Sequence, residues 1–274
     1  MTADTQTMIP LAAPDLTGNE ARYLQDCITS TYVSSIGPFV DQFESMVSAA
    51  TGAEAAVATS SGTAGLHVAL VAVGVRRDDL VILPSFTFIA SANAIAQCGA
   101  EPWLFDVTTE SWTLDPTLLR VQLERETRSE GGGRIHKSSG KRIAAIMPVH
   151  TLGLPADMDS IVQIGRDMGI PIVADAAPAI GASYKNRPMG QCGADLSVLS
   201  FNGNKTVTSG GGGAVIGDDG EALNLVRHLS STARAGADYD HDQAGFNYRM
   251  TNLQAAVGCA QLEQIGRASC RERV

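Results

Sequence analysis

Residues 199–215 read LSFNGNKTVTSGGGGAV, and the fold assignment starts from this stretch. Its apolar beginning belongs to an expected strand over Leu196–Phe201, and Lys205 follows before a run of four glycines. An isolated lysine is ordinarily a solvated surface charge. A lysine between a strand end and a glycine-rich segment can instead act as a nucleophile toward aldehydes. Lys205 is therefore the first candidate catalytic residue.

Outward from this stretch, short apolar strands alternate with helices. The expected strands are Ala55–Thr59, Leu80–Leu83, Pro102–Phe105, Ile143–Met147 and Ile170–Ala174. Helices are expected over 18–29, 39–50, 87–97, 116–126, 157–168 and 250–264, and a further helix is opened by Ser60–Thr63 and runs through Val73. A Thr17–Glu20 capping box is expected at the first of these helices, and Asp115 is expected to cap the helix over 116–126. Strands that are apolar on both faces predict an α/β fold with a mainly parallel sheet between helices. In such folds the active site lies beyond the carboxyl ends of the strands.

Polar clusters follow three of these strands: Ser61–Thr63, Asp175 and Ser200–Lys205. A Ser-Gly-Thr sequence at a helix start is usually a cap, but its free N–H groups can also hold a phosphate. Asp175 could likewise cap a helix, or it could pair with a cationic ring nitrogen, because burial of an unpaired carboxylate is costly. Aldehyde, ring nitrogen and phosphate are the groups of pyridoxal 5'-phosphate (PLP), so the three clusters together suit this cofactor.

Composition narrows the class of protein. The chain has 274 residues, of which 44% are hydrophobic and 18% charged, enough for one large core. It contains no apolar run of membrane-spanning length and no signal-peptide pattern, so we expect a cytoplasmic protein without a membrane partner. The net charge of −9 argues against a nucleic-acid partner. The five cysteines form no CxxC pair, so we expect buried thiols and no metal site.

Three segments stand apart from this pattern. Residues 1–7 are a polar N-terminal extension, and the glycine-rich stretch 127–141 is expected to be a flexible surface loop. Residues 265–274 read IGRASCRERV, which is the translation of a common sequencing adapter. We therefore interpret this last block as an artefact and exclude it from the fold.

The chain resembles the DegT/DnrJ/EryC/StrS family of PLP-dependent nucleotide-sugar aminotransferases. The matching segments are SSGTAGLHVAL, LPSFTFIASANAI, MPVHTLG, VADAAPAIGASYKNRPMG, LSFNGNKTVTSGGGGAV and GFNYRMTNLQAAVG. The resemblance implies the aspartate-aminotransferase type of fold (fold type I), with residues 8–264 as the PLP-binding large domain. It also implies that the family's small C-terminal domain is missing from this chain.

The resemblance assigns roles to individual residues. It implies that Lys205 forms the Schiff base with PLP, that Asp175 partners the pyridine nitrogen and that Phe88 stacks on the ring. Asn247 is expected to reach the cofactor phosphate of a neighbouring subunit, which implies a homodimer. The implied phosphate-binding residues within one subunit are Gly62, Thr63 and Ser200.

The implied reaction is transfer of an amino group from glutamate to a nucleotide-linked 4-keto-6-deoxy sugar, for surface-polysaccharide or glycan sugar biosynthesis. The segment SFNGNK is similar to the branch that acts on UDP-linked 4-keto-6-deoxy-N-acetylhexosamines. Pro178 departs from the family, which usually has His, Gln or Glu there, and this puts a polar contact near the cofactor in doubt. His150 is expected near the site without a defined role.

Three other functions compete with this one. Sugar dehydratases of the same family replace the lysine with histidine, so Lys205 argues against that activity. A non-catalytic regulator with the same fold is opposed by the retention of Lys205, Asp175 and the phosphate-binding residues. A plain nucleotide-binding Rossmann protein is opposed by the absence of a GxGxxG motif after the first strand.

Overall fold

The structure is a computed structural model, and it describes residues 12–266 except 219 and 237. The predicted N-terminal extension and residues 267–274 of the interpreted adapter block lie outside the described residues. Among the described residues, no helix has the length and apolar character required to cross a membrane.

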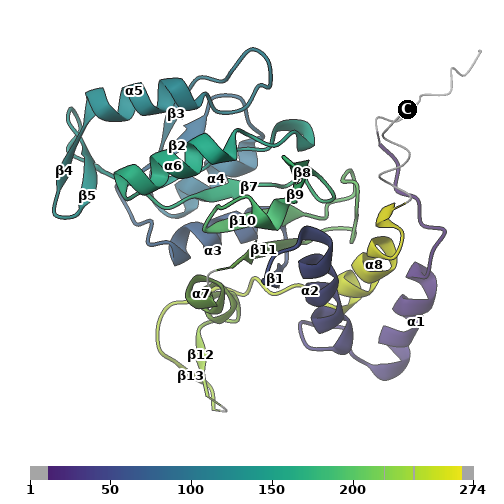
Figure 1. Ribbon diagram of the computed structural model, residues 1–274. Coiled ribbons are helices and arrows are strands. Elements are labelled where there is room, and N and C mark those ends of the chain that lie inside the picture. The colour runs from purple at the N-terminus through teal and green to yellow at the C-terminus, as the bar shows by residue number, and fades with distance from the viewer. Residues whose placement is uncertain (1–11, 219, 237, 267–274) are drawn as a thin grey trace, which may run out of the picture.

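A mixed sheet forms the middle layer of the molecule (Figure 1). Its first part has the strand order β1 (Ala55–Thr59), β11 (Gly213–Gly217), β10 (Leu196–Ser200) and β7 (Val173–Asp175). Its second part has the order β3 (Glu101–Phe105), β2 (Leu80–Pro84), β6 (Arg142–Ile146), β5 (Gly133–His136) and β4 (Thr127–Glu130). Parallel bridges from Ile146 to Ile172 and from Val149 to Asp175 join the two parts. The strands from β10 to β3 across this join run parallel, whereas β11 is antiparallel to both its neighbours.

Helices cover both faces of the sheet, as the apolar strands predict. In β2, Leu80 and Ile82 pack into one core, and Val81 and Leu83 pack into the other. The first core also takes side chains from α2 (Pro38–Thr51), α5 (Pro116–Glu126), α6 (Met158–Met168) and α8 (Asn252–Leu262). The second core takes side chains from α3 (Gly62–Ala72), α4 (Ile89–Gln97) and α7 (Gly220–Ser230). Helix α1 (Glu20–Ser30) packs beside α8 at one end of the molecule (Figure 1).

The predicted helix starts are confirmed where a polar side chain precedes the first turn. Asp115 accepts hydrogen bonds from the N–H groups of Thr117 and Leu118, with Pro116 as the first helical residue. The Thr17–Glu20 capping box is wrong, because α1 begins after Asn19 without a side-chain cap. The Glu20 carboxylate instead accepts a hydrogen bond from Gln261 of α8, 2.6 Å away.

The flexible loop predicted over 127–141 is also wrong, because this stretch contains the β4–β5 hairpin. Gly131 and Gly132 form its two-residue turn with φ angles of 60° and 82°. A two-residue hairpin turn that matches the twist of its strands needs positive φ at both positions, and glycine adopts it without strain. The hairpin then adds to the sheet through β6, and His136 packs on Trp103 with ring centroids 4.7 Å apart.

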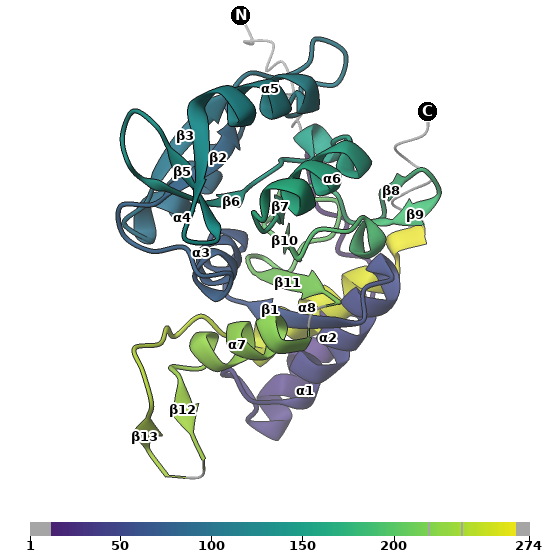
Figure 2. The same cartoon turned by 60° about the vertical axis from the view of Figure 1, so that its left-hand side comes forward.

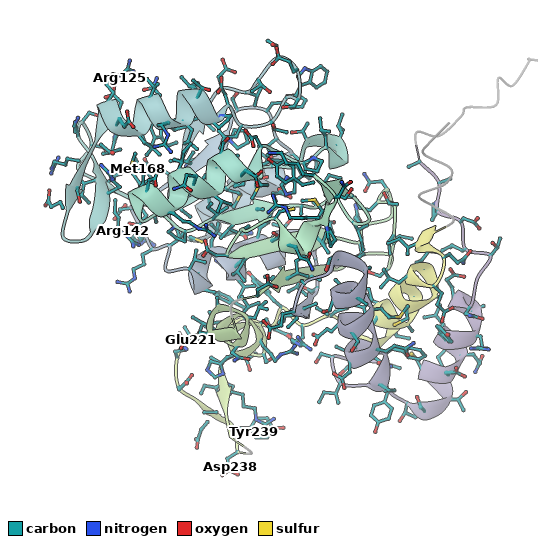
Figure 3. The ribbon with its side chains drawn as sticks, in the orientation of Figure 1. Arg125, Arg142, Met168, Glu221, Asp238 and Tyr239 are labelled. Carbon is teal, nitrogen blue, oxygen red and sulfur yellow. The ribbon has the colours of Figure 1, made fainter. Side chains whose placement is uncertain are left out.

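Some elements among the described residues have no counterpart in the predictions from sequence. The sequence patterns did not identify β11 and α7, nor the small hairpins β8 (Ser183–Tyr184) with β9 (Arg187–Pro188) and β12 (Arg234–Ala235) with β13 (Asp240–His241). Two 3-10 turns cover Thr151–Gly153 and Met189–Gln191. The β12–β13 hairpin projects from the main body, and the exposed Tyr239 lies near its tip (Figures 2 and 3).

Candidate active site

A cavity of about 540 Å³ opens at the carboxyl ends of β1, β2, β7 and β10. This is the edge of the sheet where an α/β fold places its active site. Segments far apart in the sequence meet there, and among the residues that line the cavity are Gly62, Thr63, Phe88, Asp175, Ser200 and Lys205. All the predicted site residues except Asn247 therefore share one cavity.

The start of α3 forms one wall of the cavity. Ser61 is extended (φ −164°, ψ 162°), and its hydroxyl accepts a hydrogen bond from the N–H of Ala64, so α3 begins at Gly62. The N–H groups of the first helical turn have no carbonyl partner within the helix, and the helix dipole makes this end positive. The start of α3 can therefore bind an anion such as a phosphate.

Glycines let the start of α3 lie close to the end of β10 and the start of β11. A Cβ added to Gly62 would lie 2.9 Å from the Cβ of Ser200, at the end of β10. A Cβ added to Gly213 would lie 2.7 Å from the backbone nitrogen of Gly62. Gly212 also has a φ of 112°, which side chains rarely allow. The glycine run after Lys205 thus lets β11 lie directly against the start of α3.

Asp175 is the last residue of β7 and is only 4% exposed. The Ser91 hydroxyl donates to one of its oxygens at 2.6 Å, and the N–H of Ala177 donates to the other at 3.1 Å. Burial raises the pKa of Asp175, although these hydrogen bonds and the charge of Lys205 act in the opposite direction. Among the described residues, no cation forms an ion pair with it. The cavity thus holds a buried carboxylate that an incoming cation would stabilise.

Lys205 lies in the turn that follows β10, where its N–H donates to the carbonyl of Asn202 at 3.0 Å. It is half-buried and lines the cavity. Lys185 offers a useful contrast, because it is exposed and its amine pairs with Asp159 at 2.6 Å. The hydrogen bond from Lys185 to Asp159 raises the pKa of Lys185, which keeps that amine protonated. Lys205 is therefore the better placed of the two as a nucleophile.

Phe88 precedes α4 and is 76% exposed although it lines the cavity. An aromatic side chain this exposed presents an open ring face to a ligand. Phe86, two residues earlier, also lines the cavity and packs edge-on against Trp112. The position of Phe88 thus agrees with a stacking role, which stays a prediction.

His150 is fully buried in the lining of the cavity. Its backbone N–H donates to the carbonyl of Asp175 at 2.9 Å, and its Nδ1 lies 3.2 Å from the N–H of Ala156. Burial lowers the pKa of His150 to about 4, so its ring is neutral near pH 7. Its Nε2 has no hydrogen-bond partner among the described residues.

Two residues flagged from the sequence behave differently from the rest. Pro178 lines the cavity, but proline has no N–H and offers no side-chain donor. Asn247 is exposed, pairs with Ser231 through a backbone bridge and does not line the cavity. A role for Asn247 within one chain is not supported, and its expected role across a subunit interface stays a prediction.

The sequence patterns missed Ser91 and Thr87. Ser91 is fully buried and touches Asp175, while Thr87 lies 2.7 Å from Ser91 and lines the cavity. A weak signal exists in IASANAI, where a serine lies among alanines one helical turn after Phe88. The signal does not name a partner, because Asp175 is 84 residues away.

The residues around the cavity fit PLP on structural grounds. The start of α3 and the nearby Ser200 can take an anion, and the buried Asp175 needs a cation. Phe88 offers a flat apolar face, and Lys205 offers an amine. These are the features that bind the phosphate, ring nitrogen, ring face and aldehyde of the cofactor.

Comparisons with known proteins agree with this fit. A family model described as the DegT/DnrJ/EryC1/StrS aminotransferase family matches residues 14–273. GDP-perosamine synthase of Caulobacter vibrioides is 39% identical over 97% of this chain and 68% of its own length. EpsN of Bacillus subtilis, named as a pyridoxal phosphate-dependent aminotransferase, is 38% identical over 94% of this chain and 64% of its own length.

A solved structure shows the same architecture. The crystal structure of S. venezuelae DesV superposes with a TM-score of 0.81 at 30% identity, over 93% of this chain and 67% of that one. The chain therefore spans about two thirds of the length of the relatives it matches.

Proposed function

The chain belongs to the DegT/DnrJ/EryC1/StrS aminotransferase family, which is PLP-dependent, and we propose that it provides the cofactor-binding domain of an aminotransferase acting on a nucleotide-linked sugar. One observation carries this proposal: Lys205, Asp175 and the start of α3 line the same cavity. An amine, a buried carboxylate and a helix start together match PLP better than they match a nucleotide alone.

The chain's residues divide the binding of the cofactor among them. Gly62 and Thr63 offer backbone N–H groups to its phosphate, and the Ser200 hydroxyl lies against the same helix start. Phe88, which is exposed at the cavity, would cover the ring. Lys205 would hold the cofactor covalently through Nζ. When bound, PLP withdraws electrons from the carbon that carries the amino group.

Two side chains manage the protons of the reaction. The Asp175 carboxylate stabilises a proton on the ring nitrogen, because burial makes a nearby positive charge strongly favourable for it. The Nζ amine of Lys205 would take the proton from the α-carbon of the bound amino donor and return it on the product side, so that no proton is lost to solvent. The buried side chains of Leu66 and Val149 give the cavity an apolar wall, which would limit the water that competes for these protons.

The substrates follow from the family and from the relatives. Glutamate is the proposed donor, and a nucleotide-linked 4-keto-6-deoxy sugar is the proposed acceptor. The SFNGNK segment favours a UDP-linked N-acetylhexosamine, whereas the curated relatives named GDP-perosamine synthase, at 37–39% identity, favour a GDP-linked sugar. A homodimer in which Asn247 reaches the neighbouring site is part of the proposal, and the exposure of Asn247 supports it.

A transfer assay with matched lysine variants tests this function. The protein is incubated with PLP, glutamate and either a UDP-linked or a GDP-linked 4-keto-6-deoxy sugar, and amino-sugar product is measured by mass spectrometry. We expect product with one of the two, none from Lys205→Ala and wild-type amounts from Lys185→Ala. If the protein binds the cofactor but forms no product from either sugar, even after addition of a relative's C-terminal third, the aminotransferase function is contradicted. A non-catalytic protein is then favoured. Loss of water without gain of nitrogen would favour a dehydratase.

A further inference from the structure

A short chain of hydroxyl groups leads from the cavity wall to Asp175. The hydroxyl oxygens of Thr87 and Ser91 are 2.7 Å apart, and the Ser91 hydroxyl lies 2.6 Å from Asp175 Oδ2. An ionised carboxylate only accepts hydrogen bonds, so Ser91 gives its proton to Asp175. Ser91 is then free to accept from Thr87. Both hydroxyls also lie 3.3 Å from the carbonyl of Phe88, and the much shorter contact of Ser91 with Asp175 favours the direction from Thr87 through Ser91 to Asp175.

We propose that Ser91, supported by Thr87, is the positioning residue that fixes the Asp175 carboxylate in the cavity. The inference deepens the proposed function, because Asp175 is the residue that faces the cofactor ring. Ser91 itself is fully buried on α4 and does not line the cavity, whereas its partner Asp175 does. Its effect on the reaction is therefore exerted through Asp175 and not by contact with substrate.

The place of Ser91 in α4 supports a role beyond packing. Its neighbours Ala90, Ala92 and Ala94 show that small apolar residues suit this part of the helix. Alanine is the better helix former, and a buried hydroxyl without a partner costs free energy. The hydroxyl at position 91 is accommodated because Asp175 Oδ2 needs a donor there. An alanine at this position would leave that oxygen without the donor.

The other groups around Asp175 cannot replace Ser91. His150 comes from the neighbouring strand segment, but burial lowers its pKa to about 4, so it carries no charge near pH 7. Lys205 contributes its positive charge without an ion-pair contact, and it becomes committed to the cofactor under the proposed function. The N–H of Ala177 binds the other carboxylate oxygen, Oδ1. Among the described residues, only the Ser91 hydroxyl donates to Oδ2.

Two variants and a matched control test the inference. Ser91→Ala removes the donor, and Thr87→Val removes the support of that donor with little change of shape. Ser230→Ala is the control, because Ser230 is equally buried on α7 but donates to a backbone carbonyl outside the cavity. The first measurement is the pKa of Asp175, obtained from a pH titration of its carboxyl group by ¹³C NMR in protein without added cofactor. The second is the pH midpoint of the absorbance change of bound PLP.

The expected pKa shifts have a definite sign. Loss of a hydrogen bond to the ionised carboxylate raises the pKa of Asp175 by about one unit in Ser91→Ala. A smaller rise is expected in Thr87→Val, and none in Ser230→Ala. A carboxylate that holds its own proton supports less positive charge on the ring. The nitrogen that links Lys205 to PLP then holds its proton more strongly, so the pH midpoint of the absorbance change also rises. Turnover falls roughly tenfold to a hundredfold, while KM for the sugar stays within about twofold.

The two proposals fail in different ways. If wild-type protein binds no PLP, the proposed function is wrong, and the NMR titration still decides the role of Ser91. If PLP binds but the pKa of Asp175 is the same in Ser91→Ala as in Ser230→Ala, then Ser91 does not position the carboxylate and the inference is overturned.

Discussion

Asp175 shows most directly how a single residue links this fold to its chemistry. Its carboxylate is buried at the end of β7 and is stabilised by two hydrogen bonds, but it forms no ion pair among the described residues. A buried carboxylate in this condition is costly until a cation arrives. Under the proposed function, the protonated pyridine nitrogen of PLP would supply that cation.

Replacement of Asp175 by asparagine should separate binding from catalysis. Asp175→Asn keeps the size and the contact with the ring, so we expect PLP to remain bound through Lys205. Turnover should fall by roughly a hundredfold or more, because a neutral amide cannot stabilise the ring proton. The measurement compares turnover and cofactor content with those of the wild type, with the C-terminal third of a relative supplied if catalysis needs it.

Asp79→Asn is the matched control for this variant. Asp79 is also buried, but it lies at the amino end of β2, where it pairs with Arg142. Its replacement should lower stability and leave turnover per folded molecule unchanged. Normal turnover in Asp175→Asn would show that Asp175 only supports the local backbone.

At the same scale, the sequence could predict a functional role for residues that lie at or just after the end of an expected strand. Lys205 and Asp175 each follow or end an apolar run, and an α/β fold brings such ends to one edge of the sheet. Ser91 has no such mark. Its role depends on the distance between α4 and β7, which only the packed structure defines. His150 is similar, because a Pro-Val-His motif does not reveal that its Nε2 is buried without a hydrogen-bond partner in the described part of the chain.

At the scale of elements, prediction succeeded where one local rule decided the outcome. Asp115 followed by Pro116 starts α5 as expected, and Ser61 caps α3. It failed where a local pattern allowed two outcomes. Glycines 131–133 suit a mobile loop and a tight hairpin equally well, and pairing with β6 selects the hairpin. Likewise β11 was not predicted as a central strand, because glycine is unfavourable in strands. Its glycines are present because the backbone packs closely on the start of α3.

Glu44 joins several elements beneath the cavity. Its Oε1 accepts from the N–H of Ala58 at 2.8 Å and pairs with Arg249 at 2.9 Å, while its Oε2 pairs with Arg227 at 2.8 Å. The segment that contains Arg249 also binds the N–H of Ser60 through the carbonyl of Tyr248. Glu44 therefore ties α2, α7 and the chain before α8 to β1, the strand that leads to the start of α3.

We predict that Glu44→Gln lowers the free energy of unfolding by about 3 kcal/mol, because it leaves the nearly buried Arg249 without its charge partner. Chemical denaturation measures this loss. Glu124→Gln on α5 is the control, since that carboxylate is exposed and its pair with Arg120 should contribute under about 1 kcal/mol. Equal effects of the two substitutions would show that the Glu44 cluster adds nothing specific to the fold.

At the scale of the whole molecule, about a third of the length of each relative has no counterpart in this chain. Several large apolar side chains are exposed on α1 and in the segment after it, namely Ile28, Tyr32, Val33 and Ile36. An apolar group of this kind commonly marks a surface that another part of a protein, or a partner, covers.

We predict that joining the C-terminal third of the Caulobacter vibrioides relative to residue 264 raises turnover at least tenfold, because binding energy from remote contacts orients the sugar for reaction. Turnover with glutamate and the sugar, together with light scattering, provides the measurement. The extended protein should also aggregate less, and PLP content should be similar in both forms. Equal turnover with and without the added segment would show that the large domain alone completes the site.

The proposed function requires a covalent bond between PLP and Lys205, and the lysine that forms this bond can be identified chemically. The protein is loaded with PLP, the link between amine and cofactor is fixed by borohydride reduction, and the labelled lysine is identified by peptide mass spectrometry. The account predicts one pyridoxyl label per chain, on Lys205, and loss of the visible absorbance band on reduction. A label on Lys185 or another lysine, or no label at all, would contradict it.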